Sequence, residues 1–207
     1  MTRYAVDVDG VLALQIEATL ARINMRYGTN YTKDDMVAWD AWNLIPELKG
    51  SRNEFYRAMG AAWEAGEVQA DPSASEMMRN LRLRGRVDIV TKTIAEDDTL
   101  RFWLAANGIV YDGLVHLPKG SQVSKAAFTE YDVFIDDSPK LAEEMPADKT
   151  LLLVDQPWNR NVPVRRNVRR IGSLMEAAPS GTGWYAQRHA VQARKPVSVR
   201  RHLRRTR

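Results

Sequence analysis

Two aspartates stand close together near the start of the chain, in the segment "AVDVDGVLAL". Asp7 and Asp9 end a short apolar run, and Gly10 follows them at once. Carboxylates placed this closely repel one another and lose hydration when buried, so the pair is costly unless a cation lies among them. Carboxylate oxygens are hard ligands of the kind that Mg²⁺ prefers in proteins. The spacing therefore indicates a metal site, and Gly10 suits a backbone that turns sharply past a ligand.

Polar side chains also follow three later apolar runs. Thr91 ends the run in "VDIVTKT", Lys119 follows "DGLVHLP", and Asp136 and Asp137 end the run in "DVFIDDSP". If these runs are strands of one parallel sheet, their carboxyl ends meet at the edge where such sheets bind ligands. A hydroxyl and an ammonium beside Mg²⁺ would hold a phosphate group. These residues therefore predict a phosphate and metal site at one edge of a sheet.

The elements that must position these residues alternate along the chain. Hydrophobic periodicity separates strands from helices, and their alternation is typical of an α/β fold with a Rossmann-like parallel sheet flanked by helices. We expect strands over residues 3–9, 86–93, 112–120, 132–139 and 150–159, and helices over residues 16–26, 51–66, 71–85, 95–108, 121–131 and 140–145, with a further helix starting at Thr32.

The stretch between the first two predicted strands, residues 10–86, is too long for a single crossover helix. We therefore expect a small helical cap over residues 15–71, inserted after the first strand, and a phosphohydrolase core formed by residues 1–14 and 72–177. Residues 178–207 are rich in small, polar and basic side chains, which predicts a basic, flexible tail.

Composition limits the classes of function. The 207 residues include no cysteine, which excludes disulfides, thiolate metal sites and cysteine nucleophiles. The chain has no apolar run of about 20 residues and no signal-like stretch at its start, so we expect a cytoplasmic protein. Eight of the 30 basic residues and none of the 26 acidic residues lie between Trp184 and Arg207. This basic end would either contact nucleic acid electrostatically or remain solvated.

The three motifs "DVDGVLA", "VDIVTKT" and "DVFIDDSP", in this order and on these predicted strands, resemble those of the haloacid dehalogenase-like phosphohydrolases. The opening "DGVLA", the helical insert after it and the later segment "LLLVDQPWNR" are similar to the 5'(3')-deoxyribonucleotidase family. The resemblance covers roughly residues 3–165. It implies a Mg²⁺-dependent phosphomonoesterase that hydrolyses nucleoside monophosphates through an aspartyl-phosphate, as a 5'-nucleotidase does.

The resemblance also implies roles for the acidic residues. Asp7 would be the nucleophile, and Asp9 would be the general acid and then the base for water. Asp7, the backbone carbonyl of Asp9 and Asp137 would hold Mg²⁺, while Asp136 would orient the site or pair with the lysine. Which of Asp136 and Asp137 binds the metal directly is left open at this stage.

The remaining residues would contact the substrate. Gly10, Thr91 and Lys92 are expected near the phosphate, and Lys119 would neutralise the phosphoryl group in the transition state. Lys119 has the better position, directly after a strand, whereas the alternative, Lys125, lies closer in sequence to the aspartate pair.

The predicted cap supplies candidates for contact with a nucleobase. Trp39 and Trp42 are expected there, although aromatic residues at helical spacing also pack a cap against itself. This chain has Leu14 and Gln15 where the nucleotidases have an acidic and an aromatic residue, so an aromatic wall for the base is missing at that place.

Two other functions compete with a small-molecule nucleotidase. The same chemistry could act on the phosphate at a nucleic-acid end, guided by the basic tail. The chain could instead be a non-catalytic accessory protein that binds nucleic acid through that tail.

Overall fold

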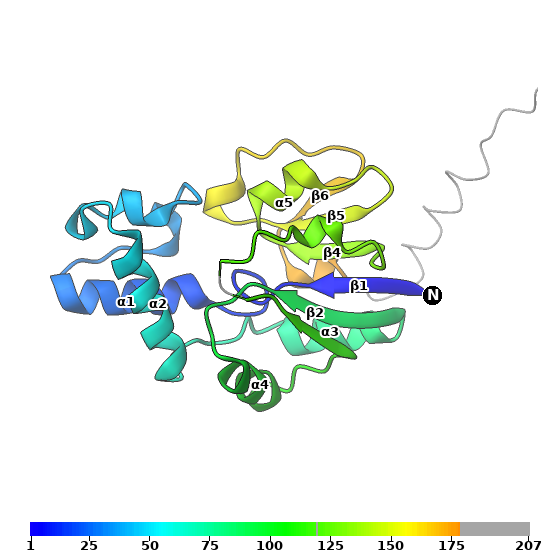
Figure 1. The fold of residues 1–207 in the computed structure, drawn as a ribbon, viewed down its shortest axis with the longest axis horizontal. Helices are drawn as coiled ribbons and strands as arrows, with labels where there is room; N and C mark the ends of the chain where they lie inside the picture. Colours follow the sequence, from blue (N-terminus) through cyan, green and yellow to red (C-terminus); the bar gives the residue numbers. More distant parts are fainter. Residues whose placement is uncertain (119, 179–207) are drawn as a thin grey trace, which may run out of the picture.

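The computed structural model describes residues 1–118 and 120–178, in which the chain forms a six-stranded parallel sheet (Figure 1). The strand order is β3-β2-β1-β4-β5-β6, and every neighbouring pair is parallel. The predicted Rossmann-like α/β fold is therefore confirmed. The strands are β1 (Thr2–Val6), β2 (Gly85–Thr91), β3 (Gly113–His116), β4 (Val133–Asp136), β5 (Thr150–Val154) and β6 (Val168–Ile171).

Helices cover both faces of this sheet. Successive residues of a strand point to opposite faces, and in β5 Leu152 packs in one apolar cluster while Leu153 packs in another. The first cluster includes buried residues of α3 (Ala74–Arg82) and α4 (Asp97–Ala106), and the second includes Leu141 of α5 (Pro139–Glu144). Three short 3-10 helices accompany them: η4 (Lys125–Ala127), η5 (Pro157–Asn159) and η6 (Leu174–Glu176).

The cap (residues 15–71) lies beyond the carboxyl ends of the strands, on the left in Figure 1. It holds α1 (Gln15–Tyr27), η1 (Lys33–Asp35), η2 (Ala41–Leu44), η3 (Pro46–Leu48) and α2 (Arg52–Glu64), and none of the strands described above. The chain enters and leaves the cap side by side, because Leu14 N donates to Gln69 O over 2.9 Å and Asp71 N donates to Leu12 O over 2.8 Å. The division into cap and core remains a proposal.

Two predicted helices are replaced by single 3-10 turns. Instead of a helix from Thr32, the structure has η1, where the Asp35 carboxylate accepts hydrogen bonds from the backbone and the hydroxyl of Thr32. Such local side-chain bonds compete with a longer helix. The expected helix over residues 121–131 is reduced to η4, which begins after Ser124, a residue whose hydroxyl accepts from Ala126 N over 3.1 Å.

Strand β6 was not predicted, because its sequence contains two arginines. Val168 and Ile171 are buried, whereas Arg170 donates to Asp155 Oδ1 over 2.8 Å and to Asn159 O over 2.8 Å. Arg165, which precedes the strand, donates to the backbone carbonyls of Ala142 and Met145. These two arginines of the segment "VRRNVRR" therefore hold the core together. No helix within residues 1–118 and 120–178 has the length and apolar character needed to cross a membrane.

Candidate active site

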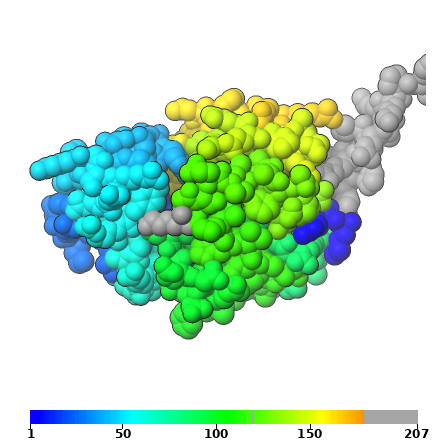
Figure 2. Space-filling view, viewed as in Figure 1, coloured from blue at the N-terminus to red at the C-terminus, as the bar shows by residue number. Residues whose placement is uncertain are grey.

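A cavity of about 990 Å³ lies between the carboxyl edge of the sheet and the cap. Figure 2 shows the cap, in blue and cyan, lying against the core, in green and yellow. Side chains from both parts line the cavity, so a ligand bound there would touch the sheet edge and the cap together. The core contributes Asp7, Asp9, Lys125 and Asp137, and the cap contributes Gln15, Trp39, Trp42 and Arg52.

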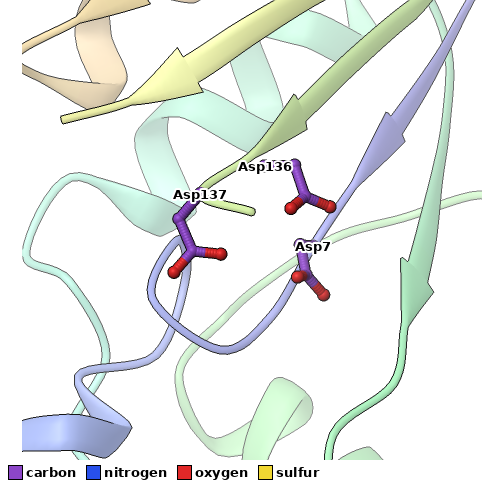
Figure 3. Close-up of side chains that lie close together, drawn as sticks. All are labelled: Asp7, Asp136 and Asp137. Carbon is purple, nitrogen blue, oxygen red and sulfur yellow. The ribbon is translucent and has the colours of Figure 1, made fainter. Parts of the chain in front are cut away.

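Three carboxylates gather at the carboxyl edge of the sheet, two of them, Asp7 and Asp137, on the cavity wall (Figure 3). Asp7 follows β1, and Asp136 and Asp137 end and follow β4, the strand that pairs with β1. One oxygen of each carboxylate lies within 4.8 Å of the others. Burial raises the pKa of both Asp136 and Asp137, although the charge of Lys125 opposes this shift at Asp136. The group therefore has the oxygen ligands and the excess negative charge that suit a divalent cation.

Lys125 lies among these carboxylates. Its Nζ is 2.6 Å from Asp7 Oδ2 and 2.7 Å from Asp136 Oδ2, and its side chain is only 9% exposed. Burial lowers the pKa of this ammonium, but the charges of Asp136 and Asp7 outweigh burial and raise it overall. Lys119, which the sequence favoured for this place, lies outside the described residues. Among the described residues, the cation beside the carboxylates is the alternative lysine, Lys125, carried by η4.

Asp136 and Asp137 differ in how their oxygens are occupied. Asp136 Oδ1 accepts from Ser138 N over 2.9 Å, and its Oδ2 accepts from Lys125. Asp137 Oδ2 accepts from Trp158 Nε1 over 3.0 Å, and its other oxygen has no hydrogen-bond partner in the described part of the chain. Asp137 is thus the better placed of the two to bind a metal directly, and Asp136 holds the lysine.

Gly10 allows the first loop to pass close to this cluster. Its φ is +72°, and a Cβ at this position would lie 2.1 Å from Asp137 Oδ2. Gln156 Nε2 donates to Gly10 O over 2.7 Å and fixes the loop from the other side. Any other side chain would displace Asp137. Gly10 was predicted to contact substrate, but it is not among the residues that line the cavity.

Asp9 lies in the same loop and lines the cavity. Burial raises the pKa of its carboxyl to about 7, with the negative charge of Asp7 as the second cause. The neighbouring Thr93 side chain and the charge of Lys125 oppose this rise in the pKa, and Asp9 Oδ1 is buried without a hydrogen-bond partner in the described residues. A carboxyl of this kind can carry a proton near neutral pH and give it up to a neighbouring group.

Strand β2 brings a different hydroxyl to the cavity from the one expected. Thr91 is fully buried, its Oγ1 accepts from Thr93 N over 3.2 Å, and it is absent from the cavity wall. Lys92 and Thr93 do line the cavity, and Lys92 Nζ donates to Ser121 O over 3.2 Å. Thr93 was overlooked, although the segment "VTKT" places a second hydroxyl two residues after the first.

The two tryptophans predicted for the cap both line the cavity but lie in different surroundings. Trp42 packs against Phe55 and Tyr56, with ring centroids 6.3 and 6.0 Å away, and the Arg52 guanidinium lies 5.4 Å from its ring centroid. Trp39 is 53% exposed and stacks on no other aromatic ring in the described residues. Trp39 therefore offers a free ring face to a ligand, whereas Trp42 is held in an aromatic cluster.

Three supporting residues could not be assigned roles from local patterns. Trp158 holds Asp137 through its indole nitrogen, and Asn159 Nδ2 donates to Asp137 O over 2.9 Å and to Val154 O over 2.8 Å. Arg52 lies on α2 and has no ion-pair partner within the described ranges. These residues contact groups that are distant in the sequence, or the faces of aromatic rings. Sequence spacing alone therefore does not indicate which contacts they make.

Comparison with known proteins places the chain among phosphohydrolases. The family model described as "5' nucleotidase, deoxy (Pyrimidine), cytosolic type C protein" matches residues 2–177. No curated protein matches the sequence.

Solved structures of the same fold match with low sequence identity. A predicted phosphoglycolate phosphatase from Haemophilus somnus has a TM-score of 0.59 at 14% identity, over 85% of this chain and 96% of that chain. Protein tyrosine kinase A from Mycobacterium tuberculosis has a TM-score of 0.57 at 12% identity, over 86% and 98% of the two chains. A haloacid dehalogenase-like hydrolase from Streptococcus pneumoniae has a TM-score of 0.56 at 13% identity, over 85% and 96%. At these identities the likeness establishes the fold alone.

Proposed function

Because this chain belongs to the family of the deoxy (pyrimidine) cytosolic type C 5'-nucleotidases, we propose that it hydrolyses nucleoside monophosphates through an aspartyl-phosphate on Asp7, with Mg²⁺ as its cofactor. Its reaction class is the hydrolysis of phosphoric monoesters. The observation that carries the proposal is the cluster of Asp7, Asp136 and Asp137 with Lys125, of which Asp7, Asp137 and Lys125 line the cavity.

Asp7 is held in one orientation for attack on phosphorus. Its Oδ1 accepts from Val8 N over 2.8 Å, and its Oδ2 faces Lys125 Nζ. In the first step a carboxylate oxygen of Asp7 forms a bond to phosphorus, and the bond from phosphorus to the leaving oxygen breaks. Lys125 is placed to balance the negative charge of the phosphoryl group as this happens.

Asp9 would move the protons of both steps. Asp9 lines the cavity, and the Oδ1 of its carboxyl has no hydrogen-bond partner among the described residues. Asp9 gives its proton to the leaving oxygen in the first step. In the second step it takes a proton from the water that attacks the aspartyl-phosphate, which restores Asp7 and releases phosphate.

The chain's oxygen ligands fit a magnesium ion. Asp7, Asp137 and the backbone carbonyl of Asp9 would hold it, while Asp136 keeps Lys125 in position. When bound, Mg²⁺ supplies charge neutralisation for the phosphate and for the crowded carboxylates.

The cap would bind the organic part of the substrate and exclude water. Trp39 offers a free ring face on which a nucleobase can stack, and Trp42 supports the wall beside it. We propose a cytoplasmic enzyme that acts on a small-molecule phosphomonoester. The expected contact between the basic tail and nucleic acid concerns residues outside the described ones.

The test is phosphate release by the full chain from a panel of ribo- and deoxyribonucleoside monophosphates, with Mg²⁺ and with EDTA. An oligonucleotide ending in a 3'-phosphate is included, because the arginines of residues 184–207 favour polyanions. We expect Mg²⁺-dependent release from the monomers and none from the Asp7→Asn variant. Release from the oligonucleotide alone would support an end phosphatase, and no release from any compound would contradict a nucleotidase.

Metal binding is measured separately from activity. Mg²⁺ should raise the melting temperature of the wild-type protein, because a ligand that binds only the folded state stabilises it. The increase should be smaller in Asp137→Asn. An equal increase in both proteins would contradict the assignment of Asp137 as a ligand.

A further inference from the structure

Unpaired polar atoms are concentrated at the cavity. Four buried side-chain nitrogen or oxygen atoms lack a hydrogen-bond partner in the described residues, and three of them belong to residues that line the cavity: Asp9, Gln15 and Trp63. Buried polar groups are nearly always paired in folded proteins. A group of exceptions at one cavity indicates that a ligand supplies the missing partners. Asp9 has its role in the proposed reaction, and Gln15 has none so far.

Gln15 is the first residue of α1, and its side-chain Oε1 is one of these unpaired atoms. The residue is only 8% exposed, so bulk water does not replace the missing partner. The loop that carries Asp7 and Asp9 ends directly before it, so Gln15 joins the reacting edge to the wall of the cap.

Gln156 is a second buried glutamine, and its side chain has a structural role. Gln156 has the same 8% exposure, but its Nε2 donates to Gly10 O over 2.7 Å and fixes the loop that carries Asp9. Gln15 makes no side-chain hydrogen bond that would fix the fold within residues 1–118 and 120–178. An apolar residue of similar length would cost the empty protein less, since an unpaired buried amide oxygen is unfavourable.

We propose that Gln15 is a specificity residue whose carboxamide hydrogen-bonds an O–H or N–H donor on the leaving group of the substrate. The donor is either a sugar hydroxyl or a nitrogen of the base. Bound substrate then pairs the amide oxygen, whereas a leaving group without a donor buries it unpaired, and this difference favours polar leaving groups. The inference rests on the proposed nucleotidase function.

The test compares Gln15→Met with the wild-type full chain on 2'-deoxyuridine 5'-monophosphate and on phenyl phosphate, which has no donor on its leaving group. Methionine keeps the length of the side chain and removes its hydrogen-bonding groups. We expect the ratio of kcat/KM for the nucleotide to kcat/KM for phenyl phosphate to fall about fivefold, which corresponds to the loss of one neutral hydrogen bond. Most of this change should be a higher KM for the nucleotide. The melting temperature should stay the same or rise.

Two further substrates identify the donor. If the sugar hydroxyl is the donor, the 2',3'-dideoxy analogue loses its sensitivity to Gln15→Met while 2-deoxyribose 5-phosphate keeps it. If the base is the donor, the 2',3'-dideoxy analogue keeps its sensitivity to Gln15→Met and 2-deoxyribose 5-phosphate loses it. Either pattern supports the proposal.

Two matched variants control for structural effects. Gln69→Met, on an exposed glutamine that does not line the cavity, should leave the substrate ratio unchanged. Gln156→Met should lower the melting temperature, because it breaks the bond to Gly10. An unchanged ratio in Gln15→Met, or a melting temperature that falls as in Gln156→Met, would overturn the inference.

Binding is measured in the Asp7→Asn background, where the nucleophile is absent. The nucleotide should raise the melting temperature of Asp7→Asn more than that of the Asp7→Asn, Gln15→Met double variant. Absence of hydrolysis by the wild-type chain would overturn the proposed function, whereas equal nucleotide binding by the two variants would overturn the role of Gln15.

Discussion

The two walls of the cavity are built in opposite ways. On the core wall the cluster around the lysine is paired within itself: Lys125 lies between Asp7 and Asp136, and Asp137 is held by Trp158, whereas Asp9 keeps one unpaired oxygen. On the cap wall the polar side chains lack such partners. Trp39 exposes its ring, Arg52 has no ion-pair partner among the described residues, and Gln15 has an unpaired oxygen.

Under the proposed function, this difference would assign the chemical step to the core wall and the choice of substrate to the cap wall. The core wall holds its charges in place before any ligand arrives, which is what a fixed phosphoryl-transfer reaction requires. The cap wall leaves its hydrogen-bonding and stacking groups for the substrate to satisfy. Substitutions on the core wall should therefore change the rate for all substrates, and those on the cap wall should change the ranking of substrates.

The largest effect is expected at the nucleophile. Asp7→Asn removes the oxygen charge that attacks phosphorus, so kcat should fall on the order of 10⁴-fold for every substrate. Phosphate release under saturating nucleotide measures this loss. Asp34→Asn, at an exposed aspartate outside the cavity, is the matched control and should retain wild-type kcat. Comparable activity in the two variants would remove Asp7 from the mechanism.

The next effect concerns the lysine of the core wall. Lys125→Met leaves Asp7 and Asp136 buried without their cation, so the free energy of unfolding should fall by about 3 kcal/mol. We also expect kcat to fall about 10³-fold. Urea unfolding and phosphate release give the two values. The Lys119→Met variant tests the other candidate lysine. If Lys119→Met abolishes hydrolysis and Lys125→Met still hydrolyses the substrate, Lys119 is the residue that neutralises the phosphoryl group.

The smallest effect separates the two tryptophans of the cap wall. Trp39→Ala should raise KM for nucleotides about tenfold and leave the melting temperature unchanged, because its ring is 53% exposed. Trp42→Ala should lower the free energy of unfolding by about 2 kcal/mol, because its ring packs against Phe55 and Tyr56. Equal changes of KM and stability in both variants would contradict the distinction between a substrate-facing and a packing ring.

Much of the core wall was predictable from the sequence because it depends on local patterns. Apolar runs that end in aspartates identify strands and their carboxyl ends, and the alternation of strands with helices makes the sheet parallel. Asp7, Asp136 and Asp137 must then meet at one edge, since parallel neighbours such as β1 and β4 end together. The same reasoning could not foresee β6, because its buried valine and isoleucine flank arginines whose partners lie elsewhere in the fold.

Only the tertiary structure decided which side chains complete the site. Lys125 lies in the 3-10 turn η4, where a helix was expected, and its Nζ is 2.6 Å from Asp7 Oδ2, a contact that sequence spacing does not indicate. Thr93 lines the cavity instead of Thr91 because the strand ends at Thr91 and the chain then changes direction. The amino-acid sequence by itself determined strands β1 to β5, the longer helices and the edge where the acids gather, through short-range periodicity. Contacts between residues distant in the chain brought Lys125, Thr93 and the unpaired Gln15 to the cavity, because packing fixes such contacts.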